Sequence, residues 1–173
     1  HVFNPSKTSD SFYTISLKVS SINACVDTIA KTIQVYPLPS IVFQPDKTSG
    51  CSILPVSFNN LSSPNDTGNI QIMKFAWNSG NGQSSTATHF SANYTSSNYG
   101  DTIYTVKLIG ESEHACVDSA TSTITVHPNP IASFNVSKTS ACTPLNLSTI
   151  NNSVSRDNQA LTYDWDFGNT FKS

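Results

Sequence analysis

Apolar and polar residues alternate along most of this chain, which is the pattern of β-strands that bury one face and expose the other. Between positions 13 and 19 every second residue is apolar, with Thr, Ser and Lys between them. Similar runs follow at 33–35, 54–58, 73–77, 104–108 and 124–126, with echoes at 145–147 and 161–165. Helical periodicity is absent. The pattern predicts an all-β fold in which about seven short antiparallel strands form a β-sandwich.

The strands belong to a longer repeat, in which the same residue types return 91 positions later. A fixed spacing of domain size is typical of tandem modules. We therefore predict the last part of one module at 1–37, a complete module at 38–128 and the first part of a third at 129–173. The two incomplete modules are expected to need partner strands from a longer polypeptide. The recurring pairs include Tyr13 and Tyr104, Cys25 and Cys116, Pro37 and Pro128, Phe43 and Phe134, and Cys51 and Cys142.

Large apolar side chains at matching places in the repeat mark the expected cores. Trp77 and Trp165 each lie on an alternating run. We expect both rings to be buried, rather than exposed as platforms on which sugars stack. Tyr13 and Tyr104 lie on the long alternating runs and belong to the same core signature. The core of the complete module should contain Phe58, Trp77, Tyr104, Val106 and Leu108.

The charge balance argues against polyanionic partners. The chain has 9 Lys and Arg against 11 Asp and Glu, for a formal net charge of −2, and Arg156 is its single arginine. That balance offers no basic surface for nucleic acid or an anionic membrane, so we expect neither as a partner. Solubility rests on 28 serines and 19 threonines, a composition more typical of secreted β-proteins than of cytosolic enzymes. No apolar run is long enough for a membrane-spanning helix.

The sequence predicts neither catalysis nor a cofactor. The four histidines are scattered, and the repeat places other residues opposite two of them, Tyr36 for His127 and Asn23 for His114. A Ser-His-Asp triad has no support beyond the abundance of serine. The segment 80–82, Gly-Asn-Gly, predicts a tight turn because no helix follows it. The cysteines lack the spacing of a zinc site, so we expect no metal.

Prolines mark the junctions between modules. The linkers are Tyr36-Pro37-Leu38-Pro39 and His127-Pro128-Asn129-Pro130. Proline fixes its own backbone and restricts the residue before it, so both joints should be stiff. No acidic cluster accompanies the linkers in the sequence, so we do not expect calcium to stiffen them.

The segment Tyr163-Asp164-Trp165-Asp166-Phe167-Gly168-Asn169 resembles the Tyr-x-Trp-Asp-Phe-Gly-Asp-Gly signature of PKD domains, immunoglobulin-like modules first named from polycystin. Other parts of the chain fit the same family in order. Phe43 matches an aromatic residue of the first strand, 54–58 matches the second strand, and 104–108 matches the sixth. The resemblance covers nearly the whole chain and implies tandem PKD-type sandwiches.

The complete module departs from this signature, because Ala76 and Asn78 flank its tryptophan. A metal site needed in every module would not tolerate that change. We therefore expect Asp164 and Asp166 to form hydrogen bonds within a turn rather than to bind calcium.

The cysteine-bearing form of the module is similar to PKD-like repeats in giant surface proteins of Bacteroidota, including gliding-motility adhesins exported by the type IX system. That resemblance implies an extracellular location on a cell surface. It also implies sugar attachment at acidic-hydroxyl-apolar sequences, which this chain has at Thr28, Thr102 and Ser119. Such short sequences also occur often by chance in a chain rich in Ser and Thr.

The four cysteines are expected to form structural disulfides in an oxidising compartment. Their pairing stays open between equal-spacing pairs, a bridge within the complete module, and head-to-tail bridges to cysteines outside this chain. Head-to-tail bridges are attractive because the two cysteine-bearing loops lie at opposite ends of an immunoglobulin-like sandwich, too far apart for one bond. The candidates are Cys25, Cys51, Cys116 and Cys142.

These observations predict a non-enzymatic stalk or fibre, a rigid spacer in a large cell-surface protein that serves adhesion or filament formation. Its partners would be neighbouring modules of the same chain, with surface polysaccharide or other cell-surface proteins as further candidates. The alternative is a carbohydrate- or protein-binding accessory module of a secreted enzyme. That alternative requires aromatic side chains exposed on one face, for which the candidates are Phe90, Tyr94 and Tyr99.

Overall fold

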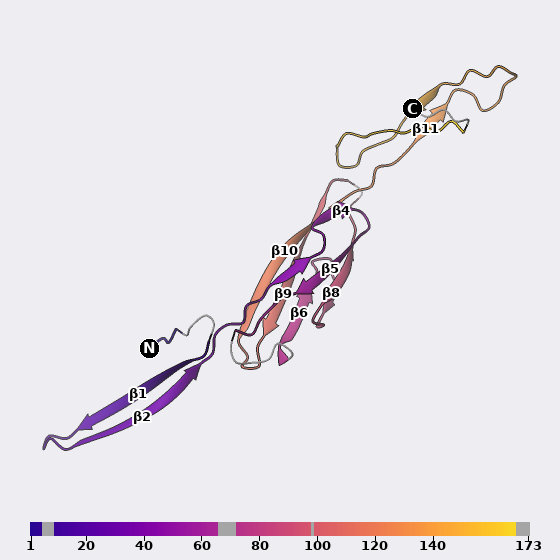
Figure 1. Ribbon diagram of the computed structural model, residues 1–173. Coiled ribbons are helices and arrows are strands. Elements are labelled where there is room, and N and C mark those ends of the chain that lie inside the picture. Colours follow the sequence, from indigo (N-terminus) through magenta and orange to yellow (C-terminus); the bar gives the residue numbers. More distant parts are fainter. Residues whose placement is uncertain (5–8, 66–71, 98, 169–173) are drawn as a thin grey trace. The chain divides into compact units, whose positions relative to one another are not determined.

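The computed structural model describes residues 1–4, 9–65, 72–97 and 99–168 (Figure 1). All of its named elements are strands, which confirms the predicted all-β class. None of the described residues forms a helix long and apolar enough to cross a membrane. The strands are β1 Ser11–Ser20, β2 Val26–Val35, β3 Phe43–Pro45, β4 Ser49–Cys51, β5 Leu54–Asn60, β6 Lys74–Asn78, β7 Ser84–Ser85, β8 Phe90–Tyr94, β9 Thr102–Glu111, β10 Val117–His127, β11 Phe134–Val136 and β12 Thr149–Asn151.

By its internal contacts the chain divides into two compact units. Unit 1 comprises His1–Asp46, Val56–Ala92 and Tyr104–Thr123, and unit 2 comprises Lys47–Pro55, Asn93–Ile103 and Ile124–Ser173. Strands β5, β8, β9 and β10 each contribute residues to both units. The module boundaries after residues 37 and 128 stay a prediction, because this division does not follow the repeat.

Strands β3 to β10 form the β-sandwich that the alternating pattern predicted. One sheet has the order β3-β5-β8, and the other has the order β4-β10-β9-β6-β7. The first strand of the module is split between them, because β3 pairs antiparallel with β5 while β4 pairs parallel with β10. This split is why the structure has more strand segments than the roughly seven expected of such a sandwich.

In unit 1, Trp77 on β6 is the centre of an aromatic cluster that joins the two sheets. Its ring centroid lies 5.1 Å from that of Phe43 on β3, 5.8 Å from Phe58 on β5 and 5.9 Å from Phe90 on β8. The indole Nε1 donates a hydrogen bond to the carbonyl of Ala87 at 3.0 Å. Trp77 is 2% exposed, so the prediction of a core anchor is confirmed and a sugar-stacking role is excluded.

The remaining predicted core residues follow the alternation, with one exception. Phe58, Val106 and Leu108 are buried as predicted, but Tyr104 near the start of β9 is only partly buried. In unit 2 the buried side chains are Leu54, Tyr94, Ile124, Val126 and Pro128.

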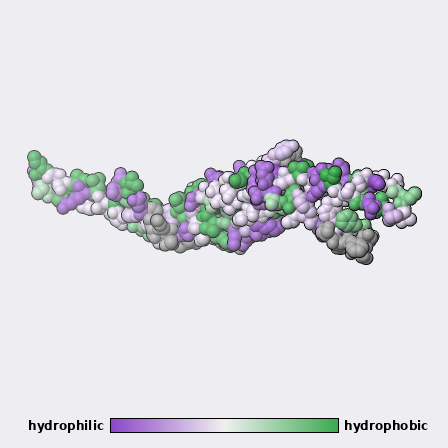
Figure 2. All heavy atoms as spheres, turned by 90° about the horizontal axis from the view of Figure 1, so that it is seen from above, coloured by the Kyte–Doolittle hydropathy of each residue, from purple (hydrophilic) through white to green (hydrophobic). Residues whose placement is uncertain are grey.

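The β1–β2 hairpin carries the same apolar face as the repeat-related strands β9 and β10, but without an opposing sheet. Leu17 is 60% exposed, whereas its repeat counterpart Leu108 is fully buried. Ile15 is exposed in the same way, and apolar residues lie among polar ones on the surface of the hairpin (Figure 2). Tyr13 is part-buried against Phe3 and donates a hydrogen bond to the carbonyl of Asn4. The hairpin therefore has the face of a core without the strands that would cover it.

Residues 131–168 form few of the strands predicted there. Only β11 and β12 pair, and the expected strands at 145–147 and 161–165 are wrong. Trp165 contacts Phe134 at 5.2 Å but is only partly buried. Among described residues 131–168 the only sheet is the β11–β12 pair, so an alternating strand here has no second sheet against which to bury its apolar face, and local propensity alone does not form one.

We predict that Trp77→Ala lowers the free energy of unfolding by about 3–5 kcal/mol, the usual range for deleting a large buried aromatic side chain. Chemical denaturation followed by circular dichroism would measure the loss. Tyr99→Ala is the matched control, because Tyr99 is 85% exposed and its removal should change stability by less than about 0.5 kcal/mol. Equal losses for the two variants would contradict the assignment of Trp77 to the core.

We further predict that Gly80→Ala is more destabilising than Gly82→Ala, although both glycines have positive φ angles. A Cβ atom at Gly80 would lie 2.5 Å from the carbonyl oxygen of Thr105, whereas nothing lies within 4 Å of one at Gly82. The expected loss is roughly 2–4 kcal/mol at Gly80 and about 1–2 kcal/mol at Gly82, where only the backbone conformation is strained. Thermal unfolding of both variants would contradict this if their midpoints were the same.

Candidate functional site

The first proline linker is fixed by burial and by hydrogen bonds within unit 1. Pro37 and Pro39 are fully buried. Asn65 donates from Nδ2 to the carbonyl of Leu38 at 3.1 Å. Just after the linker, residues 40 and 63 form an antiparallel bridge, with their backbone N–H and C=O groups 2.8 and 2.9 Å apart. The carbonyl of Leu38 and both backbone groups of Ser40 therefore have protein partners.

The ring of Tyr36 at the start of this linker stacks on His114. The two ring centroids are 3.5 Å apart and the planes meet at 10°. His114 lies in the turn between β9 and β10, which is closed by a hydrogen bond from the Ser112 N–H to the Cys116 carbonyl. This stack links the residue before Pro37 to the turn of the following module.

The second linker, in unit 2, is held in a similar way. Pro128 is buried, and the Ser52 N–H donates to the carbonyl of His127 at 2.9 Å. Asn129 donates from Nδ2 to the carbonyl of Ser52. An antiparallel bridge between Ile131 and Val154 follows, at the repeat position of the bridge after the first linker.

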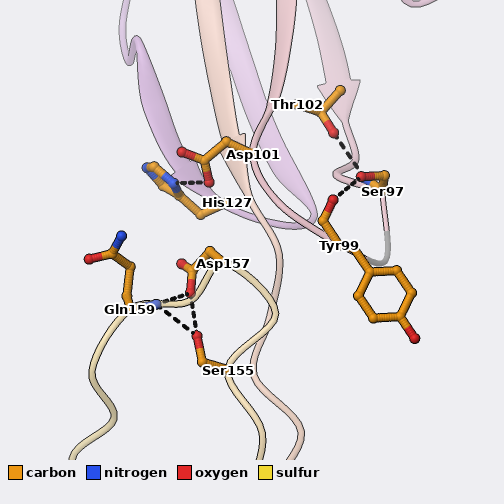
Figure 3. A network of polar contacts seen from close by, with 8 residues as sticks. All are labelled: Ser97, Tyr99, Asp101, Thr102, His127, Ser155, Asp157 and Gln159. Carbon is orange, nitrogen blue, oxygen red and sulfur yellow. Dashed lines mark hydrogen bonds and ion pairs between the residues drawn. The ribbon is translucent and has the colours of Figure 1, made fainter.

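Three side chains with metal-ligating atoms meet beside the second linker (Figure 3). Asp101 directly precedes β9, His127 is the last residue of β10, and Asp157 follows β12. One ligand atom from each lies within 4.8 Å of the other two. We call Asp101, His127 and Asp157 the junction cluster.

Neighbouring strands place two members of this cluster together. β9 and β10 are adjacent in their sheet and are joined by the turn at 112–116, so the start of β9 lies beside the end of β10. His127 Nδ1 and Asp101 Oδ1 are 2.7 Å apart, and both side chains are well over a third exposed. The two side chains are therefore within hydrogen-bond distance in a site that water reaches.

Asp157 is positioned by its own turn. Its Oδ1 accepts hydrogen bonds from the Ser155 hydroxyl at 2.5 Å and from the Gln159 N–H at 3.1 Å. The Ser155 bond, then the Gln159 bond, and to a smaller extent the nearby His127, hold the pKa of the Asp157 carboxyl below its usual value. Asp157 is therefore present as a carboxylate under neutral and mildly acidic conditions.

Backbone contacts bring the Asp157 turn to Asp101. The Gly100 N–H donates to the carbonyl of Arg156 at 2.7 Å. Two hydrogen bonds hold the segment before Asp101. The Ser97 N–H donates to Thr102 Oγ1, and the Ser97 hydroxyl donates to the Tyr99 carbonyl (Figure 3). The residues on both sides of the cluster are thus held by short-range hydrogen bonds.

The expectation that no acidic cluster accompanies the linkers is wrong at the second linker. The cluster is not visible in the sequence because Asp101, His127 and Asp157 are far apart along the chain. The repeat held a signal, since Asp101 has a counterpart in Asp10 at the 91-residue spacing. By contrast, Asp166 accepts a hydrogen bond from the Gly168 N–H, which confirms its predicted role in a turn.

None of the four cysteines is bonded to another: Cys25, Cys51, Cys116 and Cys142 are all free. Two of them lie beside the linkers. Cys51 on β4 pairs with His127 on β10, and Cys116 ends the turn that carries His114. Bridges within this chain are therefore not formed, and head-to-tail bridges to other modules stay a prediction.

The aromatic residues suggested as a binding surface do not form one. Tyr94 is fully buried, and Phe90 stacks on Phe58 and Trp77 in the core. Only Tyr99 is strongly exposed. Phe90 and Tyr94 are four residues apart on β8, so the two-residue period of a strand places both on the face that packs in the core.

The residues suggested for sugar attachment differ in their surroundings. Thr28 and Ser119 are exposed, and each backbone N–H is bonded to the carboxylate of the preceding aspartate at 2.8 Å. The hydroxyl of Thr102 instead accepts the bond from Ser97. Glycosylation at these three positions stays a prediction.

Comparison with known proteins finds similar structures but no family. No family model matches the chain, and no curated protein matches it. The PKD1 domain of the Vibrio cholerae metalloprotease PrtV is similar over 51% of this chain and 96% of that domain, with 29% identity and a TM-score of 0.42. The PKD1 domain of Vibrio anguillarum Epp is similar over 55% and 100%, with 26% identity and a TM-score of 0.44.

A structure described as showing promiscuous specificity of carbohydrate-binding modules from the β-sandwich superfamily is also similar. The match covers 59% of this chain and 48% of that one, with 21% identity and a TM-score of 0.46.

We predict that Ser155→Ala raises the pKa of Asp157 toward its ordinary value, because it removes the largest cause of the lowered pKa. A lowered pKa in the folded state contributes stability that is fully present above the unfolded pKa and is lost as the pH falls through the folded pKa. The variant should lose that contribution. Carboxyl NMR titration would measure the pKa, with Ser153→Ala as control, since Ser153 donates to the Ser133 carbonyl instead. A Ser155→Ala titration identical to that of the wild type would contradict the assignment.

Proposed function

We propose that this chain is part of a non-enzymatic stalk or fibre, in which β-sandwich modules act as a rigid spacer on a cell surface. The observation that carries the proposal is the construction of the linkers. The first has fully buried prolines at 37 and 39, and both have hydrogen bonds from neighbouring loops to the linker backbone. Proline removes backbone freedom, and these contacts restrain what is left.

The strand pairing at the second linker also suits a module under tension. β10 leads directly into this linker, and β4 pairs with it in parallel from Thr125 and Ser49 to His127 and Cys51. A pull that enters through the N-terminal end of β4 and leaves through the C-terminal end of β10 loads this pairing in shear. Under shear the hydrogen bonds resist together rather than opening one at a time, so the module should withstand force.

The proposed location is extracellular. Its support is the hydroxyl-rich, weakly charged composition, the cysteines beside the linkers and the resemblance to PKD-like repeats. We extend the proposal to a large surface protein of the Bacteroidota type, similar to gliding-motility adhesins. The partners would be neighbouring modules of the same chain, together with surface polysaccharide or other surface proteins.

The alternative, a carbohydrate- or protein-binding accessory module of a secreted enzyme, has less support. It requires several exposed aromatic side chains on one face, and two of its three candidates lie in the core. Binding of this chain to a glycan array would favour the alternative over the spacer.

We predict that replacing Pro37 and Pro39 together by glycine loosens the first linker, because glycine restores the backbone freedom that proline removes. Spin labels at Lys31 and Lys107, attached through unnatural amino acids so that the cysteines stay intact, would report the distance distribution. The distribution should broaden in the double variant and stay unchanged in Leu38→Ala, since Leu38 is an exposed residue of the same linker. An equally broad distribution in the wild-type chain would contradict the rigid spacer.

A further inference from the structure

The junction cluster combines the donor atoms that a zinc ion uses. It offers one imidazole nitrogen from His127 and carboxylate oxygens from Asp101 and Asp157. Zn²⁺ binds nitrogen and oxygen ligands readily, whereas Ca²⁺ and Mg²⁺ prefer oxygen alone. Three protein ligands would leave the fourth position of a tetrahedral site for water.

The distances in the cluster need only small adjustments to hold such an ion. Zinc bonds of about 2.0–2.2 Å place the ligand atoms of a tetrahedral site roughly 3.3–3.6 Å apart. His127 Nδ1 and Asp101 Oδ1 are 2.7 Å apart, and the ligand atoms of the three residues all lie within 4.8 Å of one another. Side-chain rotations that move the ligand atoms by about an ångström are sufficient to bring them to the spacing of a tetrahedral zinc site.

Asp157 is prepared for a cation by its surroundings. The hydrogen bonds from Ser155 and Gln159 both fall on Oδ1 and hold the carboxylate in place. The turn that holds it is fixed to the segment before Asp101 by the bond between Gly100 and Arg156.

Metal binding would exchange a proton for the ion. Without metal, a proton lies between His127 Nδ1 and Asp101 Oδ1. For Nδ1 to bind metal, a neutral ring must carry its single proton on Nε2, and a doubly protonated ring must release one proton to water.

The first linker provides an internal comparison. Tyr36 occupies the repeat position of His127, and Asp10 occupies that of Asp101. Tyr36 stacks on His114, while Asp10 accepts a hydrogen bond from Gln34 Nε2 at 2.8 Å. The counterpart of Asp157, Asp66, lies outside the described residues. Because tyrosine replaces the imidazole, the first linker lacks the nitrogen ligand of the second.

We propose that Asp101, His127 and Asp157 bind Zn²⁺, and that the ion ties the turn carrying Asp157 to the ends of β9 and β10. The three ligands come from both sides of the linker in sequence, so the bound ion would cross-link them. The second linker would then be stiffened by metal, whereas the first relies on ring stacking.

The test is zinc binding by the full chain, measured by isothermal titration calorimetry with Zn²⁺ alone. His127→Tyr introduces the residue that the first linker carries at this position, and Asp157→Asn removes one carboxylate without changing its shape. Each should weaken zinc affinity by more than about 100-fold, beyond the usual loss on removing an outer-shell partner. His114→Asn is the matched control, since the repeat has Asn23 there, and it should leave affinity unchanged.

Co²⁺ provides a second readout that separates this site from the free cysteines. The cobalt complex should show d–d absorption without a thiolate charge-transfer band, and His127→Tyr should abolish that absorption. Equal zinc affinity in the wild type, His127→Tyr and Asp157→Asn would overturn the proposal. So would a thiolate band in the wild-type cobalt spectrum, or calcium binding as tight as zinc binding. Circular dichroism of each variant confirms folding, and either variant alone suffices for the test.

Discussion

Burial of aromatic side chains between the two sheets is the interaction on which the rest of the fold depends. The indole of Trp77 reaches from β6 to the rings on β3, β5 and β8, and its N–H is satisfied by Ala87. A small sandwich has little apolar area, so a few large rings supply much of what holds its sheets together. The strands that carry the linker contacts are positioned by this packing.

Strand β10 connects the buried core directly to the second linker. Ile124 and Val126 are fully buried, and the pleat then turns His127 to the opposite face. Pairing with β4 fixes the last residues of the strand, and the Ser52 N–H holds the His127 carbonyl. The imidazole beside Asp101 is therefore placed by backbone pairing and burial, although the side chain itself is part-exposed.

The two linkers share a backbone arrangement but differ in the side chain that precedes the first proline. Both linkers are followed by an antiparallel bridge at the same repeat position. The residue before the first proline is Tyr36 in one and His127 in the other, and each has a different partner. Strand pairing depends on the backbone and tolerates this exchange, whereas a nitrogen ligand depends on the side chain and does not.

The sequence by itself determined the all-β class and the burial of Trp77, Val106 and Leu108, because alternation acts on neighbouring residues. It did not determine which copies of the pattern would be buried: Leu17 and Leu108 are equivalent in sequence, yet only Leu108 has an opposing sheet. It also misjudged Tyr94 and the strands at 145–147 and 161–165. The junction cluster was decided by tertiary structure alone, because pairing of β9 with β10 and the contact between Gly100 and Arg156 bring together residues far apart in the chain.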